Sequence, residues 1–179
     1  IYGRAAALDQ LLQIIWRLIF TKNCRLSLLA IGGYGRGELH PKSDLDLLLL
    51  GEESQLKKFS LAINSFITLL WDLNLNPGFS QRTPEQTLAS CKEDLHLATS
   101  LLEKRLICGQ NELNTQLDDM ILSANFWTSA RYFAAKKTEQ EARHLKHNST
   151  NHNLEPNIKS APGGLRDIQL LGWVAKKHF

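Results

Sequence analysis

The chain has 179 residues, of which 43% are hydrophobic and 22% are charged, with a formal net charge of +3. These proportions are typical of a soluble globular protein, and the length fits one domain, or one domain and part of another. The apolar runs fall well short of the roughly 20 residues of a membrane-spanning helix. The chain opens without a signal-peptide pattern and its three cysteines form no CxxC pair, so we expect a cytoplasmic protein with no membrane partner.

The first two-thirds of the chain alternates between helix-like and strand-like segments. In chain order, the sequence predicts a helix over 5–20, a strand over 25–33 running into a glycine loop, a strand over 43–51, a helix over 54–74, a turn over 76–78 and a short strand over 79–83. Thr83, Pro84 and Gln86 form the pattern of a capped helix start. Residues 99–109 fit either a helix or a strand.

The last third of the chain is predicted to be helical. Residues 126–147 indicate a long charged helix, 148–164 a loop and 165–179 a final helix. From Arg131 onward there are nine Lys or Arg residues against four Asp or Glu, so this part carries +5. This charge either faces a polyanion or triphosphate, or forms an ordinary solvated helix face. The fold class predicted is α/β (α+β), with a small mixed sheet, flanking helices and an all-helical extension.

Two glycines and two aspartates stand out between the first two predicted strands. Gly32-Gly33 is followed, after ten residues, by Asp44-Leu45-Asp46. A Walker A loop is excluded, because Glu38 and Leu39 stand where Lys and Ser or Thr are required. A Rossmann fingerprint is excluded too, because Glu38 occupies the third glycine position and would repel a pyrophosphate.

The two aspartates suggest a metal site. Residues two apart in a strand point to the same face, so Asp44 and Asp46 are expected side by side, with Leu45, Leu47 and Leu49 facing the core. Adjacent carboxylates repel each other unless a cation lies between them, and Mg²⁺ prefers such oxygen ligands. Glycine N–H groups can contact a phosphate closely. This pattern predicts a nucleoside-triphosphate site of the two-metal kind, in which Arg36 and Ser43 are further candidate donors.

The order GG-x10-D-x-D resembles the DNA polymerase beta-like nucleotidyltransferase superfamily. The segments "GGYGRGELHPKSDLDLLLL", "RTPEQTLASCKEDLHLATSLLEKRLICG" and "NLEPNIKSAPGGLRDIQLLGWVAKKHF" are similar to the N-terminal region of the bifunctional PII uridylyltransferase/uridylyl-removing family. The resemblance covers essentially the whole chain. It implies a helix over 1–22, a nucleotidyltransferase domain over 23–122 and a helical extension over 123–179. Because the chain begins without Met and ends inside a predicted helix, we expect a fragment of a longer protein.

The resemblance implies Mg²⁺-dependent (or Mn²⁺-dependent) transfer of uridylyl from UTP to a tyrosine of the PII signal protein. Asp44 and Asp46 would hold the metals, and Gly32, Gly33 and Ser43, with Arg36, would contact the triphosphate. The superfamily usually has a third carboxylate, often the base for the attacking hydroxyl. The candidate is Glu103, which a strand would place on one face with Arg105, whereas a helix would leave Glu103 on the surface; Asp94 is the second choice.

The segment "PNIKSAPGGLRDI" has two readings. It is a loop entering a helix, whose N-terminus favours anions, so Lys159 and Arg166 can contact a triphosphate or the acceptor protein. The other reading is structural, with Arg166 paired to a carboxylate that fixes the helical part to the sheet.

Two other functions remain open. One is adenylyl transfer to glutamine synthetase or a related protein, because a related adenylyltransferase family has a comparable "PGG-x-RDI" segment. The other is a non-catalytic nucleotide-binding or scaffolding role. A nucleic-acid partner is not expected, given the modest net charge and the lack of interleaved aromatic and basic residues. The family's HD phosphohydrolase and ACT domains have no counterpart in this sequence.

Overall fold

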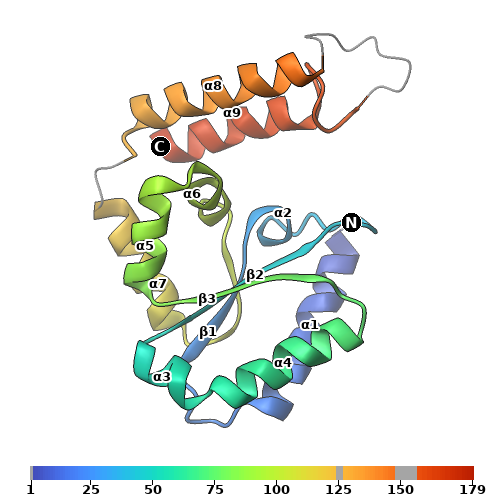
Figure 1. Ribbon diagram of the computed structural model, residues 1–179, viewed down its shortest axis with the longest axis vertical. Helices are drawn as coiled ribbons and strands as arrows, with labels where there is room; N and C mark the ends of the chain where they lie inside the picture. The colour runs from blue at the N-terminus through green and yellow to red at the C-terminus, as the bar shows by residue number, and fades with distance from the viewer. Residues whose placement is uncertain (1, 124–126, 148–156) are drawn as a thin grey trace. The chain divides into compact units, whose positions relative to one another are not determined.

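The computed structural model describes residues 2–123, 127–147 and 157–179, and the chain divides into two compact units, residues 1–123 and 124–179 (Figure 1). The first unit contains, in order, α1 (Tyr2–Ile19), β1 (Leu26–Ala30), α2 (Gly32–Gly35), β2 (Leu45–Gly51), α3 (Glu53–Lys58), α4 (Ser60–Asp72), β3 (Pro77–Arg82), α5 (Pro84–Glu93), α6 (Leu95–Leu101), β4 (Arg105–Gly109) and α7 (Asn111–Ser123). The second contains α8 (Ser129–Lys146) and α9 (Leu165–His178).

The first unit is built on a four-stranded sheet with the order β3-β2-β1-β4. β1 runs antiparallel to both β2 and β4, whereas β2 and β3 are parallel. A parallel pair needs a long connection, which α3 and α4 supply here. The predicted small mixed sheet with flanking helices is therefore confirmed.

Helices cover both faces of this sheet. Leu45, Leu47 and Leu49 of β2 lie in the main core with residues of α1 and α4, as the strand pattern predicts. Leu48 and Leu50, on the other face of β2, are also fully buried, and α7 contacts β1 and β2 there. Figure 1 shows α1 and α4 on one side of the sheet and α5 and α7 on the other. β2 is thus a central strand, and a polar side chain on it is surrounded by buried leucines of the same strand.

Several predicted boundaries differ from the structure, among them the turn predicted over 76–78, because β3 already begins at Pro77. The single helix predicted over 54–74 is two helices, α3 and α4, which meet at Phe59 (φ −100°, ψ 15°). The Phe59 ring lies 6.4 Å from that of Phe20, so a core contact is made where the helix breaks. The second strand begins at Leu45 rather than at residue 43. The ambiguous segment 99–109 contains both structures, because α6 ends at Leu101 and β4 begins at Arg105.

The second unit is a pair of helices linked by side chains of both. The Asp167 carboxylate accepts hydrogen bonds from Arg143 (2.7 Å), Gln140 (2.9 Å) and the Gly163 N–H (2.7 Å), and lies 3.0 Å from His144 Nε2. On the other turns of α9, Leu170 and Trp173 are buried. Residues 126 and 148–156, which belong to the predicted helix and loop, lie outside the described residues.

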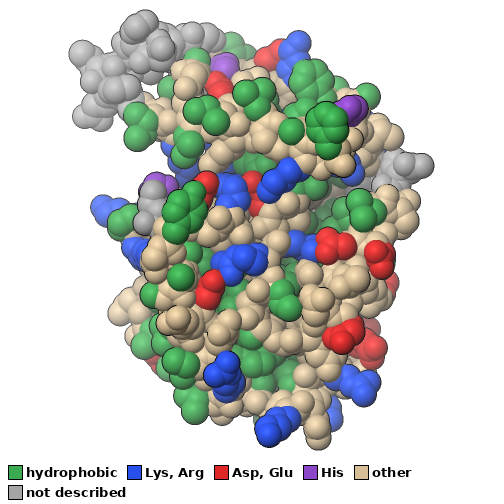
Figure 2. Space-filling model, turned by 180° about the vertical axis from the view of Figure 1, so that it is seen from behind, with side chains coloured by type: hydrophobic (Ala, Val, Ile, Leu, Met, Phe, Trp, Pro, Cys, Tyr) green, Lys and Arg blue, Asp and Glu red, His purple; other side chains and the backbone are tan. Residues whose placement is uncertain are grey.

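The outer face of α9 stays largely uncovered in this chain. Ile168 and Leu171 are 65% and 70% exposed, and Figure 2 shows hydrophobic side chains among the charged ones on the surface of the second unit. None of the described helices is long and apolar enough to cross a membrane.

Candidate active site

The glycine pair forms a tight turn between β1 and the candidate metal ligands. Gly32 has φ +56°, a left-handed conformation that favours glycine. It begins α2, a single helical turn whose first N–H groups have no acceptor within the helix. The Ile31 N–H donates to the Asp46 carbonyl oxygen at 3.1 Å, so the turn is tied directly to β2 beside Asp46.

The Asp46 carboxylate lies in a slot between two glycines. A Cβ atom built on Gly32 would stand 3.5 Å from Asp46 Oδ2, and one built on Gly78 would stand 2.8 Å from Oδ1. The same point on Gly32 is 3.6 Å from the Ser100 hydroxyl oxygen of α6. The structure therefore brings Gly32, Gly78 and Ser100 together around Asp46. The sequence predicted Gly32 here, but placed Gly78 in a turn and did not single out Ser100.

Asp44 and Ser43 lie just before β2 and are exposed. The Ser43 N–H donates to the His40 carbonyl oxygen at 3.0 Å, which closes a turn ahead of the strand. Only Asp46 of the aspartate pair is inside the strand, because pairing with β3 starts at Leu45. Asp44 thus lies outside the strand, two residues before Asp46 in the sequence.

This donor set fits a hard divalent cation. Among the residues that the structure describes, no group of three or more His, Cys, Asp or Glu side chains is placed to hold a metal. Mg²⁺ is commonly bound by only one or two carboxylates, with water and substrate phosphates completing its shell. Asp46 beside the glycine turn, with Asp44 two residues earlier in the chain, fits that mode, and neither Gly32 nor Gly78 places a Cβ atom against the Asp46 carboxylate.

Arg36 and Glu103, which the sequence proposed for different roles, form an ion pair with each other. Arg36 Nη1 donates to Glu103 Oε2, and Arg36 Nε donates to Glu38 Oε2 at 2.8 Å. Glu103 lies between α6 and β4 and is only 7% exposed, so it is neither a strand residue nor a surface residue. The structure does not join its carboxylate to the two aspartates as a third metal ligand.

Asp94, the second choice for a third carboxylate, has a local structural role. It is the N-cap residue of α6, and its carboxylate accepts hydrogen bonds from the N–H groups of His96 (2.8 Å) and Leu97 (3.1 Å). Such caps stabilise the start of a helix.

A second network, which the sequence did not reveal, holds the glycine turn in place. Asp9 of α1 accepts hydrogen bonds from the Tyr34 hydroxyl (2.6 Å) and from Arg105 Nη1 (2.6 Å). Arg105 also donates to the Gly35 carbonyl oxygen at 3.3 Å. Burial, and then the bond to Asp9, raise the pKa of the Tyr34 hydroxyl far above its usual range, so it stays protonated as a donor. Helix α1 and strand β4 are thereby fastened to α2.

Lys159 and Arg166 both belong to the second unit. Lys159 is exposed in the turn before α9. The Arg166 guanidinium donates to Gln169 Oε1 at 3.0 Å and lies 5.6 Å from the centre of the Trp173 ring. At the start of α9, the Gly163 N–H already has the Asp167 carboxylate as its acceptor.

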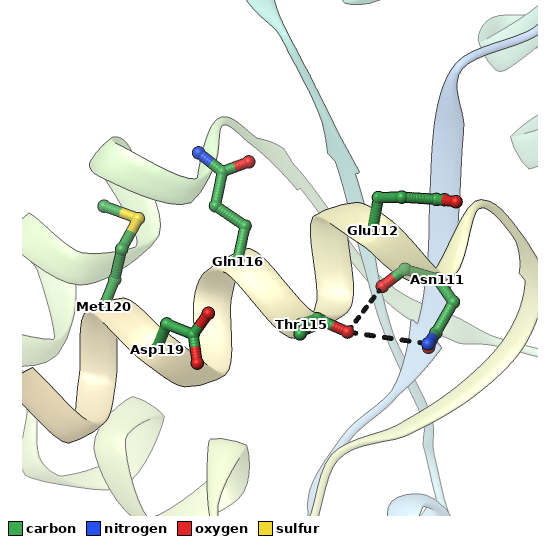
Figure 3. Close-up of a pocket in the computed structure, with 6 residues that line it drawn as sticks. All are labelled: Asn111, Glu112, Thr115, Gln116, Asp119 and Met120. Atoms are coloured by element: carbon green, nitrogen blue, oxygen red, sulfur yellow. Dashed lines mark hydrogen bonds between the residues drawn. The ribbon is translucent and has the colours of Figure 1, made fainter.

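A separate hollow of about 470 Å³ runs along α7. Figure 3 shows the side chains of Glu112, Gln116, Asp119 and Met120 projecting from this helix. None of the candidate site residues lines it.

A mixed sheet with Asp46 on a central strand beside a glycine turn, and Asp44 just before that strand, has the features that the D-x-D pattern predicts for the class of nucleotidyltransferases. The comparison with protein families agrees, since residues 12–108 match the family described as "Nucleotidyltransferase domain", and the chain belongs to this family. The predicted superfamily and fold are thus confirmed. Residues 131–179 match a second family, described as "GlnD PII-uridylyltransferase".

Relatives that align with the whole of this chain belong to a narrower group. The bifunctional uridylyltransferase/uridylyl-removing enzymes of Vibrio vulnificus and Vibrio cholerae are 47% identical to this chain over 180 residues, and that of Pseudomonas aeruginosa is 45% identical. Each alignment covers 100% of this chain but only 20–21% of the relative, so the chain spans about a fifth of the length of these curated relatives. A solved toxin–antitoxin complex with AMP-PNP aligns with 79% of this chain and 96% of its own, at 12% identity and a TM-score of 0.35.

Proposed function

We propose that this chain catalyses uridylyl transfer from UTP to a tyrosine hydroxyl of the PII signal protein, with release of pyrophosphate. The observation that carries the proposal is the Asp46 carboxylate in its slot between Gly32 and Gly78, beside the turn that opens α2. The names of the similar enzymes support uridylyl as the group transferred, and the family match over residues 131–179 supports PII as the acceptor.

In this reaction the tyrosine oxygen forms a bond to the α-phosphorus of UTP, and the bond from that phosphorus to the pyrophosphate oxygen breaks. Asp44 and Asp46 would hold Mg²⁺ (or Mn²⁺), which would offset the negative charge of the triphosphate and of the leaving pyrophosphate. The N–H groups of Gly32 and Gly33 and the hydroxyl of Ser43 would donate to phosphate oxygens.

The hydroxyl proton needs an acceptor, and Glu103 is the predicted base. In this structure one oxygen of its carboxylate, Oε2, is bonded to Arg36, so Glu103 would accept the proton on Oε1, or on Oε2 once Arg36 moves to another partner. Glu38, already bonded to the same guanidinium, is placed to keep Arg36 when Glu103 releases it.

The proposal is tested by incubating the chain with purified PII, Mg²⁺ and either labelled UTP or labelled ATP. We expect label on PII from UTP alone, and its loss in Asp46→Asn. Asp119→Asn, which removes an exposed carboxylate on α7, is the matched control and should keep full transfer.

Three other results would replace the proposal. Transfer from ATP to glutamine synthetase would establish the adenylyl alternative. Mg²⁺-dependent UTP binding without transfer would show that catalysis needs other parts of the longer relatives. No nucleotide binding at all would leave the scaffolding role.

A further inference from the structure

We propose that Gly78 is a positioning residue of the candidate active site, because its missing side chain leaves the space that the Asp46 carboxylate occupies. The inference rests on the proposed function in taking Asp46 as a metal ligand. Gly78 is the register partner of Asp46 on the adjacent parallel strand β3, so the two residues face each other across one pair of strands.

The requirement for glycine at this position comes from the carboxylate and not from the backbone. The positive-φ glycines of the described residues are Gly32, Gly37, Gly109 and Gly163, so Gly78 has a conformation that alanine can adopt. The three atoms nearest to a Cβ built on Gly78 all belong to Asp46: Oδ1 at 2.8 Å, and Cα and Cγ at 3.9 Å. Only the oxygen is too close, because 3.9 Å is an ordinary van der Waals contact.

Other glycines near the sheet differ in this respect. A Cβ on Gly51 would meet the Leu26 side chain at 2.2 Å, and one on Gly109 would meet the Leu26 carbonyl oxygen at 2.1 Å. Those glycines allow close packing of the fold. Gly78 is exposed and contacts the candidate metal ligand, so its role belongs to the site.

A methyl group at residue 78 should therefore displace Oδ1 while leaving the strand intact. The carboxylate is at the end of a short side chain, so rotation about the side-chain bonds can move Oδ1 away from residue 78 without moving the backbone. The carboxylate would then leave its place between Gly32 and Gly78, where the proposed function has it bind the metal. The expected defect is in the metal dependence of nucleotide binding, which a purely structural glycine would not change.

The test is calorimetric titration of the full chain with UTP at graded Mg²⁺ concentrations. We expect Gly78→Ala to raise the Mg²⁺ concentration for half-maximal UTP binding at least tenfold, with the thermal midpoint nearly unchanged. Gly3→Ala is the matched control, since a Cβ there meets nothing within 4 Å, and it should bind like the wild type. In an Asp46→Ala background, Gly78→Ala should add no further defect.

Three other results would overturn the role of Gly78, and one of them would overturn the proposed function too. If Asp46→Asn abolishes Mg²⁺-dependent UTP binding but Gly78→Ala does not, the role of Gly78 is overturned and the proposed function stands. An equal binding defect from Gly78→Ala with and without the Asp46 carboxylate also overturns the inference, because the effect would then be structural. If the wild type shows no Mg²⁺-dependent UTP binding, the proposed function fails, and the inference with it.

Discussion

The carboxylates of Asp44 and Asp46 differ in setting, because Asp44 is exposed before β2 and Asp46 lies within the strand. We expect Asp44→Asn and Asp46→Asn each to lower uridylyl transfer at least about 100-fold, since lost metal stabilisation is worth several kcal/mol and about 1.4 kcal/mol is tenfold in rate. Stability should be unchanged or slightly higher, because a like-charge repulsion is relieved. Label transfer and thermal unfolding measure the two effects, and full turnover by the double variant would refute the metal assignment.

Glu103 has two possible roles that one substitution can separate. If Glu103 serves as the buried partner of Arg36, Glu103→Gln should be less stable by about 3 kcal/mol, because removing one member of a buried pair leaves the other charge poorly compensated. As a general base, it should make the same variant lose turnover, and the remaining activity should lack the rise with pH that ionisation of a base produces.

Chemical denaturation and the pH profile of transfer therefore belong in the same experiment on Glu103→Gln. Glu38→Gln is the control for the stability measurement, because it removes the more exposed partner of Arg36 and should cost about 1 kcal/mol or less. A Glu103→Gln variant with wild-type stability would contradict the structural role of the pair.

At the residue scale, what could be predicted depended on local spacing. The sequence could single out Gly32, Asp44 and Asp46 as candidates because they lie close together along the chain, in a glycine pair followed by a D-x-D pattern. Gly78 reaches Asp46 only through the pairing of β2 with β3. Glu103 meets Arg36 across 67 residues. No local pattern encodes such contacts, so the sequence could name Glu103 and Arg36 but not their partnership.

Helices and strands show the same contrast between features set by local sequence and features set by long-range contacts. The start of α5 was predictable because its capping box is local: Thr83 Oγ1 accepts from the Gln86 N–H at 3.2 Å, and Gln86 Oε1 accepts from the Thr83 N–H at 3.0 Å. The break at Phe59 was not, because helical periodicity continues through it and the packing is against Phe20, which follows α1 and is distant in sequence. The order of strands, with β1 between β2 and β4, likewise follows from tertiary packing.

The α8–α9 pair should be sensitive to acid through Asp167. Burial acts to raise the pKa of this carboxyl, but hydrogen bonds from Gln140, Arg143, Gly163 and His144 outweigh it and hold the pKa well below its usual range. A depressed pKa in the folded state means that the ionised form stabilises the fold. This stabilisation is complete above the unfolded pKa of about 4 and is lost as the pH falls through the lower folded value.

Asp167→Asn should therefore lower stability at pH 7, by about 2 kcal/mol for a charge-assisted network. It should also flatten the loss of stability between roughly pH 4 and pH 2. Thermal midpoints measured by circular dichroism across this range compare the variant with the wild type. Glu141→Gln, on an exposed part of α8, is the control and should keep the wild-type slope. Equal acid sensitivity of Asp167→Asn and wild type would show that other carboxyls dominate.

At the scale of the whole molecule, the candidate residues are shared between two units. The first unit holds the glycine turn, the two aspartates and Glu103, whereas the second holds Lys159 and Arg166. The two family matches follow a similar division, since one covers residues 12–108 and the other 131–179. The match to the nucleotidyltransferase family thus covers most of the sheet unit, and the match to the family described as "GlnD PII-uridylyltransferase" covers the helical pair.

Lys159 is the better residue with which to ask what the second unit contributes. Its side chain is exposed, whereas Arg166 is engaged with Gln169 and Trp173 within α9. If Lys159 contacts the triphosphate, Lys159→Ala should weaken UTP binding about fivefold, as expected for one ion pair of about 1 kcal/mol at a solvated site. The defect should shrink as salt rises, because screening weakens the contact in the wild type.

A contact between Lys159 and the acceptor protein predicts different kinetic effects of Lys159→Ala. If Lys159 contacts PII, UTP affinity should stay at the wild-type value while the KM for PII rises by a similar factor. The control is Lys176→Ala, which removes an exposed positive charge from the last turn of α9 and so reproduces any effect of net charge alone. Steady-state transfer with PII varied, together with UTP titration at two salt concentrations, separates the two contacts. If the UTP affinity and the KM for PII both match the wild type, Lys159 contacts neither molecule. The turn before α9 then serves the fold of the second unit, where the Gly163 N–H donates to the Asp167 carboxylate.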